Sequence, residues 1–129
     1  MPHFSEISLK RLKETHADLR TLFTEVIKHF DCRVICGYRG EEAQNRAYRN
    51  KFSKVKFPNS MHNKNPALAI DVIPYPVDWD DADRMRLFGM FVRGIAVGMG
   101  IEIRWGGDWN SNMDLDDQKF IDLPHFELV

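Results

Sequence analysis

The stretch Ala67-Leu68-Ala69-Ile70-Asp71-Val72-Ile73-Pro74 is a run of apolar residues that predicts a β-strand over residues 67–73, ending at the proline. One carboxylate, Asp71, stands inside this run. A buried carboxylate without a partner is energetically expensive, so Asp71 requires a cation or several hydrogen-bond donors. A bound metal ion satisfies that requirement, and so does an ion pair with an arginine such as Arg39. The residues alone leave both alternatives open.

Two histidines and a second carboxylate extend the pattern around Asp71. His62 precedes the strand, and Asp122-Leu123-Pro124-His125 lies close to the end of the sequence. Two imidazoles and one carboxylate commonly hold a catalytic zinc ion and leave a fourth position open for water. Asp122 is placed to act as the base that activates this water, although an Asp beside a Pro is most often a loop residue. A lone His125 would usually be structural, but the set together favours a hydrolase.

Three further polar residues are candidates for supporting roles, each with an ordinary structural alternative. Ser60 either bonds the backbone near His62 or helps to bind substrate. Asp108, between two tryptophans, either orients a histidine or serves as a turn carboxylate. Arg39, at the end of a predicted strand, either binds a substrate carboxylate or forms a surface ion pair with a neighbouring glutamate.

Bulk properties restrict the class of protein. The 129 residues, 43% hydrophobic and 29% charged, fit one globular domain, and the net charge of -1 argues against a nucleic-acid partner. Cys32 and Cys36 would lie too far apart along a strand for a relaxed disulfide, so we expect free thiols. The sequence lacks a signal peptide and an apolar run that could cross a bilayer. We therefore expect synthesis in the cytoplasm and no insertion into a membrane.

Periodicity predicts an α+β domain. An apolar face at helical spacing predicts one long helix over residues 8–30, with His16 packed as a structural histidine on its buried side. The acidic loop at residues 108–117 offers carboxylates for calcium, but it lacks the Gly and terminal Glu of an EF-hand loop, so we expect solvated charge. The other predicted elements are a strand at 32–36, a helix at 41–51 with Ala43, Ala47 and Tyr48 inward, a loop at 52–66, a helix from Asp80 or Asp81 to residue 97, and strands at 101–105 and 126–129.

With these motifs assembled, the sequence resembles the zinc D-Ala-D-Ala carboxypeptidase and L-alanyl-D-glutamate peptidase family, and most closely its phage endolysin branch. The ordered set covers residues 37–128. One departure is that eight residues separate His62 from Asp71, more than in the family's commonest motif, so residues 63–68 should bulge outward. The motifs that carry the resemblance are Gly37-Tyr38-Arg39 with Glu42 and Gln44, Ser60-x-His62 with Ala69-x-Asp71 and Pro74, and Trp105-Gly106-Gly107-Asp108-Trp109 with Asp122-x-x-His125-Phe126-Glu127-Leu128.

The resemblance implies a fold and a site. The fold would be a single compact α+β domain over residues 1–129, with a small antiparallel sheet packed against helices and zinc in a cleft, as in hedgehog and DD-peptidase domains. The activity would be hydrolysis of the L-Ala–D-Glu bond in the peptidoglycan stem peptide. One Zn2+ per chain would be held by His62, Asp71 and His125, with Asp122 as catalytic base, Arg39 binding or polarising substrate, and Ser60, Gln44, Asp108 and Trp105 in supporting roles.

Other functions remain open at this stage. The same site could serve a D,D-carboxypeptidase or dipeptidase acting on D-Ala-D-Ala termini. The same fold could be a non-catalytic zinc-binding module, although Asp122 argues against that, or a metal-free structural domain. For the endolysin we expect a monomer without a separate wall-binding domain. It would be made in the host cytoplasm and would reach the cell wall after a holin pore opens.

Overall fold

A four-stranded antiparallel sheet with the order β1-β2-β4-β3 forms the centre of the structure, a computed structural model that describes residues 2–129. The strands are β1 (Cys32–Cys36), β2 (Ala69–Pro74), β3 (Ile103–Trp105) and β4 (His125–Leu128). The predicted strand around Asp71 becomes β2, which pairs with β1 on one side and β4 on the other. The register between β2 and β4 places Asp71 opposite His125.

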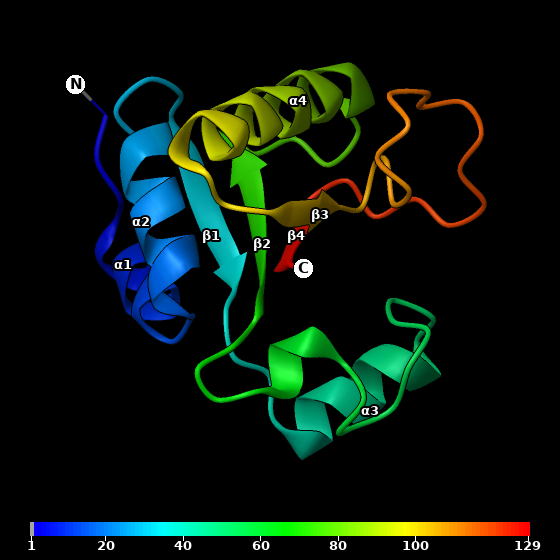
Figure 1. Ribbon diagram of the computed structural model, residues 1–129. Helices are drawn as coiled ribbons and strands as arrows, with labels where there is room; N and C mark the ends of the chain where they lie inside the picture. The colour runs from blue at the N-terminus through cyan, green and yellow to red at the C-terminus, as the bar shows by residue number, and fades with distance from the viewer. Residues whose placement is uncertain (1) are drawn as a thin grey trace.

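Helices cover one face of this sheet (Figure 1). The helices α1 (Glu6–Lys13), α2 (Ala17–Val26) and α4 (Ala82–Met99) contribute to one core with the sheet, whereas α3 (Glu41–Arg49) lies apart from them. Ile70, Val72 and Phe126 belong to that core. Side chains alternate along a strand, so Asp71 and His125 lie on the opposite face. The strand pattern therefore directs the polar residues away from the helices.

The predicted helix over residues 8–30 is wrong, because the chain breaks between α1 and α2. Thr15 pairs with Ala67 across an isolated bridge, and its hydroxyl donates to the Leu12 carbonyl at 2.7 Å. The His16 ring accepts from the Asp18 amide at 3.0 Å and caps α2. His16 is therefore a half-buried helix cap rather than a packed core histidine. The apolar period continued across the break because both helices pack on the same core.

The helix α3 also differs from its prediction. It ends at Arg49, and its fully buried residue is Gln44, whereas Ala43 and Tyr48, which we also expected to face inward, are exposed. The helix α4 follows its prediction more closely: the Asp81 side chain caps it, and Gly100 ends it in a left-handed conformation with φ of 71°. The α+β class and the small antiparallel sheet packed against helices are confirmed. None of the helices between residues 2 and 129 combines the length and hydropathy needed to cross a bilayer.

Candidate active site

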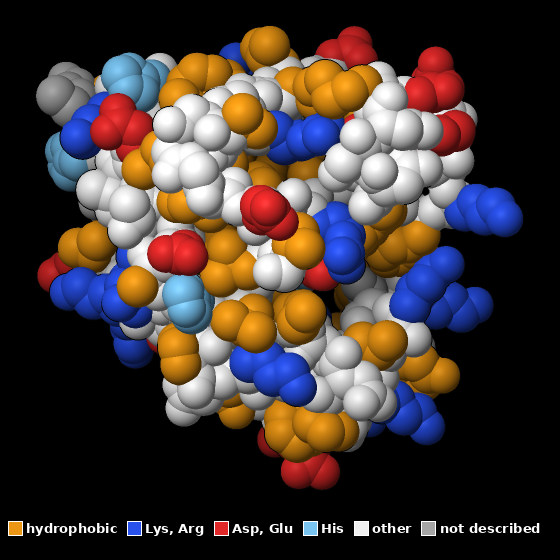
Figure 2. Space-filling view, viewed as in Figure 1, with side chains coloured by type: hydrophobic (Ala, Val, Ile, Leu, Met, Phe, Trp, Pro, Cys, Tyr) orange, Lys and Arg blue, Asp and Glu red, His pale blue; other side chains and the backbone are white. Residues whose placement is uncertain are grey.

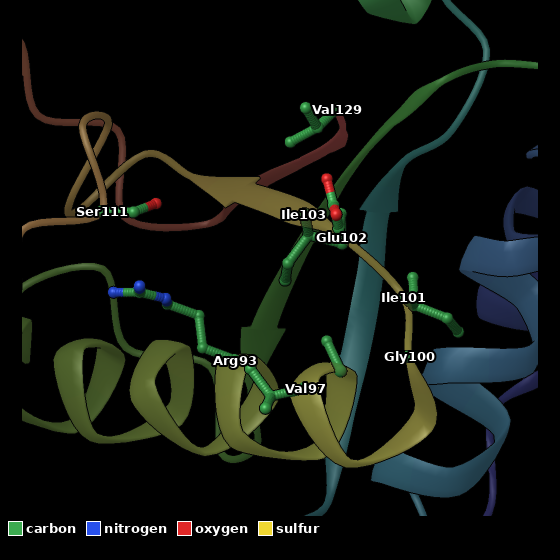
Figure 3. Close-up of a pocket in the computed structure, with 9 residues that line it drawn as sticks. Arg93, Val97, Gly100, Ile101, Glu102, Ile103, Ser111 and Val129 are labelled. Atoms are coloured by element: carbon green, nitrogen blue, oxygen red, sulfur yellow. The ribbon is translucent and has the colours of Figure 1, made fainter.

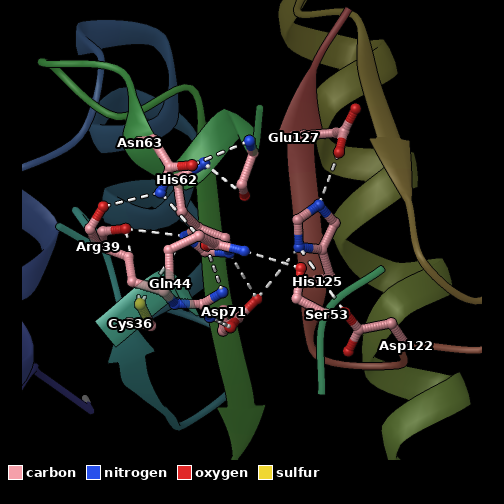
Figure 4. Close-up of polar contacts among 12 residues, drawn as sticks. Cys36, Arg39, Gln44, Ser53, His62, Asn63, Asp71, Asp122, His125 and Glu127 are labelled. Carbon is pink, nitrogen blue, oxygen red and sulfur yellow. Dashed lines mark hydrogen bonds and ion pairs between the residues drawn. The ribbon is translucent and has the colours of Figure 1, made fainter. Parts of the chain in front are cut away.

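Asp71, His62 and His125 converge on one point of the exposed sheet face (Figure 4). The strand pairing brings His125 Nδ1 to 3.3 Å from Asp71 Oδ1. His62 comes from a short 3-10 turn, η1 (Met61–Asn63), and its Nε2 lies 3.2 Å from the same oxygen. The Ser60 hydroxyl caps this turn by accepting from the His62 amide at 3.2 Å. Two segments far apart in sequence thus present two imidazoles to one carboxylate.

The remaining ring nitrogens show which atoms carry protons. His62 Nδ1 lies 2.8 Å from the Gly37 carbonyl, which can only accept, so this nitrogen donates. His125 Nε2 lies 2.7 Å from Glu127 Oε1 and donates to that carboxylate. In neutral imidazoles the two nitrogens that face Asp71 then carry lone pairs. Three acceptors that face one another require either additional protons or a cation between them.

The separation of Asp71 from each histidine fits a tetrahedral zinc ion, whereas His62 and His125 belong to two different candidate metal groups that share Asp71. Metal bonds of about 2.0–2.2 Å at tetrahedral angles separate neighbouring ligand atoms by about 3.3 Å. The two contacts to Asp71 measure 3.2 Å and 3.3 Å. The nitrogen, nitrogen and carboxylate donors are also a set that zinc accepts. Cys36 Sγ lies 3.8 Å from His62 Nδ1, and Cys36, His62 and Asp71 offer ligand atoms within 4.8 Å of one another.

The electrostatics of the cluster favour positive charge at the same point. Burial alone lowers the pKa of both histidines, but the Asp71 carboxylate outweighs it and raises the pKa of His62 to about 10 and of His125 to about 9. Burial raises the pKa of Asp71, yet the two histidines outweigh it and hold this pKa well below its usual range. A divalent cation bound to the three residues would supply the charge that protons supply without it.

Asp122 stands beside this cluster with its Oδ2 3.9 Å from His125 Nδ1. The Asp122 amide donates to the Gly106 carbonyl at 2.9 Å. A Cβ at position 106 would overlap the Asp122 carbonyl, so this close approach requires glycine. Burial, with the nearby Asp71 charge, raises the pKa of Asp122 to about 6. Its carboxyl group can therefore take up and return a proton near neutral pH.

Arg39 connects the cluster to α3. Its guanidinium lies 3.4 Å from Asp71 Oδ2 and donates to Gln44 Oε1 at 3.1 Å. Asn63 Nδ2 donates to the Arg39 carbonyl at 2.8 Å and to Gln44 Oε1 at 3.2 Å. The ion pair with an arginine that was one alternative for Asp71 is therefore present, and the two histidines that face Asp71 keep the metal alternative as a prediction. Arg39 does not take its alternative as a surface ion pair with a glutamate among the described residues.

Two of the predicted supporting residues lie elsewhere. Asp108 is fully buried, pairs with Arg93 at 2.8 Å and accepts from the Met113 amide, so it fixes the following loop instead of orienting a histidine. Trp105 is in the core, where its indole N–H donates to the Leu123 carbonyl at 2.8 Å. It supports the segment before His125 without lining the cleft.

Glu127 orients His125, although it was not among the predicted site residues. It lies within the quoted motif, two positions after His125, and alternate residues of a strand share a face. That spacing was the signal available in the sequence. The longer His62–Asp71 connection bulges only in part: residues 64–66 are exposed, whereas Asn63 folds inward and Ala67 is buried against Thr15.

A cleft of about 700 Å³ contains the cluster. Figure 2 shows this face of the molecule hollowed between its upper and lower parts. Polar residues of the cluster form the floor, and the walls are Phe52, Lys54, Val55, Trp79, Trp109, Phe120 and Pro124. A separate cavity of about 430 Å³ lies between α4 and β3 (Figure 3), but its cation, Arg93, is already paired with Asp108. The cleft is therefore the better candidate for substrate binding.

The fold and the cluster together define a class, an α+β domain with a candidate metal centre in which Asp71 is shared by two groups, Cys36–His62–Asp71 and Asp71–Asp122–His125. The chain belongs to the phage L-alanyl-D-glutamate peptidase family, which matches it over residues 1–129. It is therefore a peptidase, and the resemblance to the endolysin branch is confirmed.

A relative and a solved structure agree with this assignment. The L-alanyl-D-glutamate peptidase of Escherichia phage T5 is 29% identical over 137 residues, which cover 98% of this chain and 97% of that protein. The crystal structure of the Serratia marcescens L-Ala D-Glu endopeptidase ChiX matches with a TM-score of 0.77 at 25% identity, over 99% of this chain and 91% of that one.

Proposed function

We propose that the protein is a zinc-dependent peptidoglycan endopeptidase that hydrolyses the L-Ala–D-Glu bond of the stem peptide. One observation carries the zinc site: His62 Nε2 and His125 Nδ1 both face Asp71 Oδ1, at 3.2 Å and 3.3 Å. These three atoms would hold one Zn2+ per chain. The family match supports the choice of bond, since the two relatives described above are named for it.

In this proposal the chain's own residues position the peptide and move protons. Bound zinc supplies a Lewis acid that polarises the scissile carbonyl and lowers the pKa of water at the site. Asp122 accepts the proton of the attacking water and returns it to the leaving amine. Arg39 holds Asp71 and places positive charge where the carbonyl oxygen becomes negative. The apolar walls of the cleft exclude water from around the bond.

The biological setting is part of the same proposal. The protein would act as a monomer on the cell wall, after a holin pore releases it from the host cytoplasm. A D,D-carboxypeptidase would use the same groups but would release free D-alanine, whereas the proposed endopeptidase exposes a new amino terminus on D-Glu. Mass spectrometry of digested peptidoglycan distinguishes these products.

The roles of Asp122 and His125 are tested by separate variants. Asp122→Asn should keep about one zinc per chain yet lose turnover by about 10²- to 10⁴-fold, because it removes only the proton acceptor. His125→Ala should lose both zinc and turnover. Zinc content is measured by elemental analysis and turnover by peptide cleavage. Full activity of Asp122→Asn at matched zinc content would refute the assignment of the base.

A further inference from the structure

We propose that Lys54 binds the free carboxylate of the D-glutamyl residue on the leaving side of the scissile bond. This inference rests on the proposed function. A glutamyl residue carries two carboxyl groups, and a linear peptide continues through only one of them. The other remains an anion close to the leaving amine. A cleft that accepts this residue therefore has to compensate one negative charge.

Two residues among those lining the cleft are Lys or Arg, and one of them is already engaged. Arg39 pairs with Asp71 and Gln44. Lys54 makes no ion pair with a carboxylate of the described residues, and its ammonium lies 4.7 Å from the centre of the Phe120 ring. Its donors are thus available to an anionic ligand.

The surroundings of Lys54 are consistently basic although the whole chain has a net charge of -1. Residues 43–70 include six Lys or Arg and no Asp or Glu. Figure 2 shows Lys and Arg side chains gathered on the right of this face, where α3 and its following loop lie in Figure 1. This distribution attracts an anionic group toward one wall of the cleft.

A buried amide holds the residues on both sides of Lys54. Gln44 Nε2 donates to Ser53 Oγ at 2.8 Å and to the Val55 carbonyl at 2.8 Å. Gln44 is fully buried, and its oxygen accepts from Arg39 (Figure 4). One side chain therefore positions the residues beside Lys54 and also the guanidinium beside Asp71. This explains why α3 buries a glutamine rather than an alanine.

The opposite wall leads from Lys54 to the candidate zinc ligands. The Phe120 and Trp109 ring centroids are 6.1 Å apart, and those of Trp109 and His125 are 5.3 Å apart. The ammonium of Lys54 thus stands at the end of a row of rings that reaches His125. The contact with Phe120 holds the exposed ammonium over the ring face, at the edge of the cleft. A carboxylate held there lies in the same cleft as Asp71 and Asp122.

The test uses two peptides that differ only in the D-glutamyl carboxyl group through which the chain does not continue. One peptide has this group as a free carboxylate, and the other has it as a carboxamide. Zinc-loaded wild type and Lys54→Gln are compared on both. We expect kcat/KM on the carboxylate peptide to fall about tenfold in Lys54→Gln, the cost of one charged hydrogen bond, with little change on the carboxamide. Lys56→Gln is the matched control, because Lys56 lies over the Tyr48 ring and does not line the cleft. It should behave as wild type.

Peptide binding is monitored through the fluorescence of the tryptophans in the cleft. It tests the carboxylate site independently of cleavage, and so independently of the proposed function. Equal losses on both peptides would show that Lys54 only packs against Phe120, and no loss on either would equally reject a carboxylate site. A wild type that binds the carboxylate peptide more tightly through Lys54, yet cleaves neither peptide, would refute the proposed function and retain the carboxylate site.

Discussion

Glu127 fixes the ring of His125 by accepting from Nε2 at 2.7 Å, and its other oxygen lies 3.3 Å from Arg104. In the neutral imidazole, this contact leaves the lone pair on Nδ1, which is directed at Asp71. The carboxylate also increases the basicity of the ring. Glu127 therefore determines how His125 is presented, although it does not face the shared acceptor position itself.

Glu127→Gln is expected to weaken zinc binding by about 10- to 100-fold, because an amide of the same size is a poorer acceptor for the His125 N–H. Competition with a chromophoric chelator measures the dissociation constant. Glu102→Gln is the matched control, because Glu102 is exposed and is not part of the cluster. Unchanged affinity in Glu127→Gln would show that the buried carboxylate does not tune the site.

The candidate ligands were predictable from their residue types, whereas their partners were not. An Asp inside an apolar strand requires a cation or several hydrogen-bond donors, so Asp71 could be singled out without a structure. The partner of Asp108 depends on how a long loop closes over α4, where Arg93 stands. The role of Glu127 depends on which face of β4 turns toward β2. The spacing of Glu127 from His125 places the two on one face of a strand, but the partner of Asp108 is not encoded in local sequence spacing.

At the scale of elements, the contact between α4 and β3 depends on a glycine. A Cβ added at Gly89 would overlap the Trp105 indole, which is itself fully buried. A Cβ added at Gly94, on the same helix, would meet no atom within 4 Å. An alanine at position 89 therefore tests the packing of α4 against Trp105, whereas an alanine at position 94 tests only the preference of the helix for alanine over glycine.

Gly89→Ala is expected to lower the free energy of unfolding by about 1–3 kcal/mol, since the helix must move away from the indole. Gly94→Ala should raise it by about 0.5–1 kcal/mol, because alanine loses less backbone entropy in a helix. Urea unfolding of both variants measures these changes. Equal effects in the two variants would contradict a close packing of α4 on Trp105.

Element types were predictable to a larger extent than element boundaries. The strands and α4 follow from alternation, apolar period and caps that act within a few residues. The break between α1 and α2 does not, because Thr15 pairs with Ala67, more than fifty positions away. The prediction of which side of α3 faces inward was also wrong. The buried residue is Gln44, which is held by hydrogen bonds, and a hydrophobic pattern does not detect these.

At the scale of the whole molecule, the sheet separates two environments. One face packs on helices in a continuous apolar core, and the other carries the acid and imidazole cluster at the floor of the cleft. The segment at residues 43–70, which includes six Lys or Arg and no Asp or Glu, adds a basic region beside the cleft that the total charge of -1 conceals. Charge distribution in three dimensions is therefore more informative about the substrate than net charge.

The most direct test is zinc content together with mass spectrometry of digested peptidoglycan, with and without a chelator. We predict about one zinc per chain and a new amino terminus on D-Glu that disappears when the chelator removes the metal. Restoring zinc should restore cleavage. Cleavage at the L-Ala–D-Glu bond that persists at full rate in zinc-depleted protein would contradict the account.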